Sequence, residues 1–201
     1  MSPTTVATEP ELKVNRVLFT RDEYHRIAAS GVLDDRRVEL IRGEIVEMSP
    51  MGSSHMWVLN RLNAFFSTLY QTRQAISSNQ CPIAASGISE PQPDLCLVSL
   101  DCERRQEIPT AADIFLIIEV SDSSLESDRR LNGPLYAEAG VAEYWIANIA
   151  DRCLEIHRDP DPAHAVYRQR LIVRGQEPIA PLAFPEMTIL PDRVFGKEAD
   201  Q

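Results

Sequence analysis

The chain has 201 residues, a formal net charge of −10, 44% hydrophobic residues and 25% charged residues. This length and composition predict one soluble domain with a single core, and no apolar run approaches the ~20 residues that a membrane-spanning helix needs. The acidic charge argues against broad, non-specific attraction to nucleic acid.

The first segment, residues 1–16, is polar, contains two prolines and shows no periodicity. We therefore expect a flexible tail followed by one domain over residues 17–196. The segment also lacks the basic start and apolar centre of a signal peptide. The expected location is the cytoplasm.

A helix is predicted next, from the capping box formed by Thr20 and Glu23 to about Ala29, where Gly31 ends it. Residues 38–41 and 44–48 flank an Arg-Gly pair and predict a β-hairpin. Glu39 lies on the same side of the first strand as Ile41. It is either a charged edge-strand side chain that protects against aggregation or part of a site.

The longest helix is predicted from Ser53 or Ser54, as N-cap, to about Gln71. Its core-facing stripe repeats at steps of four and three, and comprises His55, Leu59, Leu62, Phe66 and Leu69. The histidine, in the first turn, is either a satisfied core residue or a group that hydrogen-bonds a phosphate oxygen or a carboxylate of a site.

Two short apolar runs, residues 91–98 and 113–120, predict buried strands. Asp94 opens the first strand and Glu119 ends the second, so antiparallel pairing would bring the two carboxylates together. Acidic side chains are rarely buried without a partner. An oxygen-rich site of this kind suits Mg²⁺ or Mn²⁺. Gln92, just before the first strand, is a predicted phosphate or water contact.

The remaining segments are assigned more coarsely from their apolar runs and from their Pro and Gly positions. We expect an extended segment over 75–85, a polar loop over 101–112, a helix over 125–139 that Gly140 ends, strands over 144–149, 154–158 and 165–173, a turn over 159–162, and an irregular strap over 178–195.

The four cysteines form no Cys-X-X-Cys pair and have no histidine at zinc-finger spacing. Free thiols are therefore expected, with Cys96 a small buried hydrophobe. Three arginine pairs are candidates for a local basic face, although each is more often simply solvated: Arg36-Arg37, Arg104-Arg105 and Arg129-Arg130.

An ordered set of segments carries a family resemblance, although none of them is specific alone. They are Glu39-Leu40-Ile41-Arg42-Gly43-Glu44-Ile45-Val46-Glu47-Met48-Ser49-Pro50 with His55, Glu90-Pro91-Gln92-Pro93-Asp94, Ile118-Glu119-Val120-Ser121-Asp122-Ser123-Ser124, Asp128-Arg129, and Tyr136-Ala137-Glu138-Ala139-Gly140-Val141-Ala142-Glu143-Tyr144-Trp145-Ile146. Over about residues 19–195 the chain resembles the Pro-Asp … (Asp/Glu)-X-Lys nuclease superfamily and, more narrowly, its restriction-endonuclease-like Uma family.

The resemblance implies an α/β (α+β) fold, with a mixed central sheet flanked by helices. It also implies Mg²⁺ or Mn²⁺ bound by Asp94, Glu119 and the carbonyl of Val120, with Glu39 as a third acid. The superfamily's lysine position is Ser121 in this chain. The family commonly moves that lysine to the following helix, where this chain has Asn132, a neutral residue.

Three functions follow as alternatives. The first is a metal-dependent DNA endonuclease, slow or inactive without the lysine, for which Arg129 or Arg130 could supply the charge. A homodimer is expected for it, since one site cuts one strand. The second is a nuclease-fold module that has lost turnover and binds nucleic acid or a protein partner. The third is a structural acid pair in an α/β domain.

Overall fold

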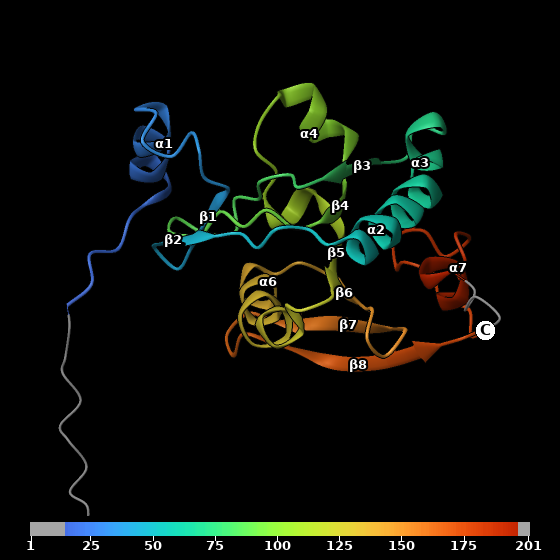
Figure 1. Ribbon diagram of the computed structural model, residues 1–201. Coiled ribbons are helices and arrows are strands. Elements are labelled where there is room, and N and C mark those ends of the chain that lie inside the picture. Colours follow the sequence, from blue (N-terminus) through green and yellow to red (C-terminus); the bar gives the residue numbers. More distant parts are fainter. Residues whose placement is uncertain (1–14, 197–201) are drawn as a thin grey trace, which may run out of the picture.

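The computed structural model describes residues 15–196, which form a mixed six-stranded sheet flanked by helices, as predicted (Figure 1). The strand order is β3-β4-β5-β6-β7-β8, in which β5 and β6 pair in parallel and every other neighbouring pair is antiparallel. The strands are β3 (Ile76–Asn79), β4 (Leu95–Val98), β5 (Ile114–Ser121), β6 (Glu143–Asn148), β7 (Cys153–Asp161) and β8 (Val166–Arg174).

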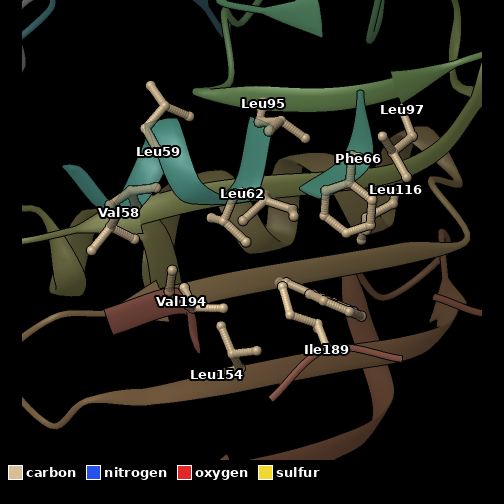
Figure 2. Close-up of a cluster of buried hydrophobic side chains, with 14 of the residues drawn as sticks. Val58, Leu59, Leu62, Phe66, Leu95, Leu97, Leu116, Leu154, Ile189 and Val194 are labelled. Carbon is tan, nitrogen blue, oxygen red and sulfur yellow. The ribbon is translucent and has the colours of Figure 1, made fainter. Parts of the chain in front are cut away.

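The two faces of the sheet are covered by different helices, because successive side chains of a strand point to opposite faces. On β5, Ile118 belongs to the core cluster that helix α2 (Ser53–Phe66) covers, and Ile117 belongs to the cluster on the opposite face. Figure 2 shows the first cluster, in which Leu62 and Phe66 lie over the sheet. All five residues of the stripe predicted on this helix are buried.

Helix α2 differs from its prediction at both ends. Gly52, not Ser53 or Ser54, is the N-cap, and no side chain caps the first turn. The helix ends at Phe66, and α3 (Thr68–Gln71) follows after Ser67. The Ser67 hydroxyl donates to the Ala64 carbonyl at 2.8 Å. Such bonds compete with the helical ladder, which accounts for the break.

The segment predicted as one helix over 125–139 is helical throughout but not uniform. It consists of α5 (Leu125–Ser127), the π-helical turn η2 (Asp128–Asn132) and α6 (Gly133–Ala139). Gly140 ends it as predicted, with φ of 82°. This segment connects the parallel strands β5 and β6. A π-turn inside a helix frequently marks a functional site, and this one carries two residues of the site described below.

The N-terminal part adds helix α1 (Arg21–Ala29) and the hairpin of β1 (Val38–Ile41) and β2 (Glu44–Glu47). The predicted capping box of α1 is present. Arg42 and Gly43 both have positive φ, as a tight hairpin requires. Main-chain hydrogen bonds tie the hairpin to the rest of the domain: the Glu90 N–H donates to Leu40 at 2.7 Å and the Gly43 N–H to Ile88 at 2.7 Å.

Two loop predictions are wrong, and that of an irregular C-terminal strap holds only as far as residue 190. The segment 101–112 contains α4 (Leu100–Arg105), which Ser99 caps through the Asp101 N–H, and the 3-10 turn η1 (Ala111–Asp113). Strand β7 continues through the predicted turn to Asp161. Its register with β8 is the same on both sides of Asp159, which has φ of 57°. The C-terminal strap ends in helix α7 (Pro191–Phe195).

The predicted flexible tail lies almost entirely outside the described residues. At its end, Arg16 forms an ion pair with Glu44 of β2 at 2.5 Å. Between residues 15 and 196, no helix has the length and apolar character to cross a membrane.

Candidate metal and active site

Asp94 and Glu119 are interlocked at one end of the β4–β5 pair, which is antiparallel as predicted. The Asp94 N–H donates to Glu119 Oε2 at 3.1 Å, and the Val120 N–H donates to Asp94 Oδ2 at 2.8 Å. Because the N–H and C=O of one strand residue point to the same side, the Val120 carbonyl also faces Asp94. The three residues predicted as ligands therefore lie together.

Glu119 is held by the helical segment that covers its face of the sheet. The Tyr136 hydroxyl donates to Glu119 Oε1 at 2.8 Å, and Asn132 Nδ2 approaches the same oxygen at 3.4 Å. Burial raises the pKa of Glu119 well above its usual range, and the negative charges of Asp94 and Asp128 raise it further. The buried glutamate thus favours either a proton or a cation at this point.

Asp128 joins the two predicted acids, although the sequence reading named it only as part of a motif. It is 3% exposed and accepts hydrogen bonds from Ser121, from Ser124 at 2.7 Å and from Asn132 at 3.0 Å. Burial raises its pKa, despite the hydroxyl bonds that lower it. Ser121, at the superfamily's lysine position, is therefore engaged with Asp128.

Glu39 reaches the same group of acids from strand β1. Its Oε2 accepts the Gln92 N–H at 2.9 Å. Burial raises the pKa of Glu39, with further contributions from the charges of Asp128 and Asp94. Gln92 lines the cleft, but its side-chain amide donates to the Val38 carbonyl at 3.1 Å, so part of its role is to hold β1 in place.

His55 contacts the site through Asp94. Its Nε2 lies 2.9 Å from Asp94 Oδ2, and because a carboxylate only accepts, this nitrogen carries the proton. The ring is 9% exposed, and its Nδ1 is buried without a partner in the described part of the chain. Of the two predicted possibilities, the geometry matches the histidine that hydrogen-bonds a carboxylate of the site.

These side chains line a cleft of about 490 Å³. Its walls carry six acidic residues, Glu39, Glu47, Asp94, Glu119, Asp122 and Asp128. Within residues 15–196, His55 is the one basic side chain that pairs with any of them, and Arg37 is the one arginine in the lining. The cleft is therefore strongly acidic.

The two arginines proposed to replace the missing lysine are engaged elsewhere. Arg129 binds Glu155 of β7 with two hydrogen bonds, of which the Nε–Oε2 bond is 3.1 Å long. Arg130, which is mostly exposed, pairs with Glu126 at 2.9 Å. Neither lines the cleft, so that suggestion is not supported by the geometry.

The donor set fits a hard cation that keeps part of its water shell. In the described residues, no group of three or more His, Cys, Asp or Glu side chains could hold a metal ion on its own. Mg²⁺, however, is usually bound by one or two carboxylates plus waters and substrate phosphates. Asp94 Oδ2 already accepts two protein hydrogen bonds, whereas Oδ1 has no protein donor among residues 15–196.

The sequence reading missed two residues of the site, Asp128 and Tyr136. A signal was present, because Asp128, Asn132 and Tyr136 follow one another at steps of four and so share one side of a helical segment. Asn132 was predicted as a site residue, whereas Asp128 and Tyr136 were named only within family motifs.

Comparisons with known proteins agree with this architecture. A family model described as "Uma2: Putative restriction endonuclease" matches residues 21–192. A crystal structure of "a putative nuclease belonging to DUF820" from Anabaena variabilis ATCC 29413 superposes with a TM-score of 0.70 at 15% sequence identity, and the match covers 88% of this chain and 97% of that one. No protein with curated annotation matches the chain in sequence.

Proposed function

The chain belongs to the Uma2 family, and from this membership we propose that it is a metal-dependent endonuclease that hydrolyses phosphodiester bonds of DNA. The observation that carries the proposal is the group of four interacting acids, Glu39, Asp94, Glu119 and Asp128, whose only basic partner within residues 15–196 is His55. Such a group requires protons or a cation in place of its missing counter-charge.

Asp94, Glu119 and the Val120 carbonyl would hold Mg²⁺ or Mn²⁺, with Glu39 as a further acid beside them. The metal would polarise the phosphate and lower the pKa of the attacking water. The chain's own residues fix the geometry: His55 and the Val120 N–H hold one oxygen of Asp94, and Tyr136 holds one oxygen of Glu119.

Turnover is expected to be slow. Asn132 stands where the family commonly has a lysine, and it contacts Asp128 and Glu119 as a neutral donor. Loss of one electrostatic contact to the transition state typically costs on the order of 10²–10³ in rate. This observation favours the second candidate function, a module that binds nucleic acid or a protein partner without turnover.

Nicking of supercoiled plasmid in Mg²⁺ or Mn²⁺ tests the proposal. Asn132→Lys should raise the rate above that of the wild type, and adding Asp94→Ala should abolish the gain. Asn60→Lys is the matched control, because it places the same charge on an exposed position of α2 outside the cleft. If none of these proteins cuts, the non-catalytic module replaces the nuclease.

A homodimer in the cytoplasm remains part of the proposal. A duplex has two strands of opposite polarity, so two copies of one site suffice to cut both. Sedimentation of the protein with and without a DNA duplex tests this arrangement.

A further inference from the structure

The acidic cleft has few positively charged side chains that could bind a substrate phosphate. A polyanion that approaches six carboxylates needs fixed positive charge nearby as well as a metal ion. Asn132 is neutral, Arg129 is bound to buried Glu155 and Arg130 pairs with Glu126. Among the described residues that line the cleft, this leaves Arg37 as the one side chain with a permanent positive charge.

The main chain around Arg37 is fixed on both sides. The Arg37 carbonyl accepts the Met48 N–H at 2.8 Å, which closes the open end of the β1–β2 hairpin. The next carbonyl, of Val38, accepts the Tyr24 hydroxyl at 3.0 Å and the Gln92 side chain at 3.1 Å. The residue after that is Glu39, one of the four clustered acids. Arg37 is thus attached to a rigid part of the cleft wall.

The Arg37 side chain, in contrast, has no polar partner within the described structure. It is exposed at the cleft, and within residues 15–196 it makes no hydrogen bond or ion pair, although six acids line the same cleft. An unpaired guanidinium retains all five N–H donors for a ligand. Their planar arrangement matches the oxygens of a phosphate with two parallel hydrogen bonds.

We infer that Arg37 binds a backbone phosphate of the nucleic-acid substrate at the rim of the cleft. This inference rests on the proposed function and adds a residue that contacts the substrate. The neighbouring Arg36 is also exposed and without a side-chain partner in the described residues, but it does not line the cleft. The two residues therefore form a matched pair that differs in position and not in chemistry.

The test measures the binding of a fluorescent phosphorothioate duplex, which resists cleavage, at constant MgCl₂ and varied NaCl. Each phosphate that a protein contacts contributes about 0.9 to the slope of log K against log salt for duplex DNA. Arg37→Ala should make the slope shallower by about one and weaken binding about tenfold. Arg37→Lys should keep the slope, and Arg36→Ala should change neither quantity.

The outcomes separate the inference from the proposed function. If Arg37→Ala and Arg36→Ala have the same slope and affinity as the wild type, Arg37 contacts no phosphate and the inference fails, while DNA binding and the nuclease proposal stand. If the wild type binds no duplex in Mg²⁺, both fail. A loss in Arg37→Ala that Arg37→Lys restores supports the inference.

Discussion

Glu155 provides a quantitative test of what holds the π-turn in place. This buried residue of β7 receives hydrogen bonds from Arg129 of η2, from Asn148 at 3.1 Å and from Arg170 at 2.5 Å. Burial alone would raise the pKa of Glu155, but the two guanidinium groups and the Asn148 amide outweigh it and lower the pKa to about 2. The carboxylate is therefore strongly favoured in the folded state.

The lowered pKa gives the size of the expected effect. Each unit by which a folded-state pKa is lowered is worth about 1.4 kcal/mol, so a fall from 4.5 to about 2 corresponds to about 3.5 kcal/mol. Removal of one partner from a buried ion pair typically costs about 3–5 kcal/mol. We therefore expect Glu155→Gln to lower the free energy of unfolding at pH 7 by about 3.5 kcal/mol.

The sign of the pH dependence follows from the same pKa. A carboxylate with a lowered pKa stabilises the fold above pH 4.5, and this contribution is lost as the pH falls from 4.5 towards 2. Urea unfolding of wild type and Glu155→Gln, at pH 7 and at successively lower pH, should show a difference that shrinks over this range.

The matched control is Glu126→Gln on α5. Glu126 also faces Arg129 and Arg130, at 3.8 and 2.9 Å, but it is exposed, so its removal should cost less than about 1 kcal/mol. The reasoning is refuted if Glu155→Gln is no more destabilising than this control, or if its effect does not change with pH.

Three further outcomes are expected. Mn²⁺ should raise the melting temperature of the wild type by mass action, and the double variant Asp94→Ala with Glu119→Ala should lose this rise. If the double variant shows the same rise as the wild type, the metal binds elsewhere. Tyr136→Phe should weaken Mn²⁺ binding about 10–100-fold in a titration, because residues that orient metal ligands have effects of this size. The control Tyr167→Phe removes a hydroxyl bonded to the Val141 carbonyl and should leave Mn²⁺ affinity unchanged. Equal Mn²⁺ affinities of Tyr136→Phe and the wild type would contradict the orienting role. Because the pKa of Glu119 is raised, the metal-free fold should lose stability as the pH rises above 4.5, and Glu119→Gln should remove this loss. If urea unfolding gives wild type and Glu119→Gln the same dependence of stability on pH, this prediction is wrong.

The central sheet was predictable because its strands are short apolar runs bounded by polar or proline-rich segments, and burial on both faces requires such runs. The same logic placed Asp94 beside Glu119, since an acid at the start of one strand and another near the end of its antiparallel neighbour must meet. The capping box of α1 and the Arg42-Gly43 turn were readable from local chemistry alone.

What escaped prediction depends on longer-range contacts. The π-turn has no local sequence signature in Asp128–Asn132. Its Arg129 binds Glu155, a residue of β7 that lies 26 positions later in the chain. Tyr136 was named only within a family motif, because nothing near it in sequence shows that its hydroxyl meets Glu119. Helix α4 had a readable Ser99 cap, but it has only six residues and little periodicity.

The parallel pairing of β5 with β6 has a consequence for how the protein is made. A chain that has left the ribosome only as far as Ser121 already contains both interlocked acids, Asp94 and Glu119, on an antiparallel pair of local strands. The segment that brings Asp128 and Asn132 to them is anchored only after β6 and β7 have been synthesised, because parallel pairing requires the full crossover and Arg129 requires Glu155. A fragment that ends at Ser121 would therefore lack the residues that complete the cleft around the two acids.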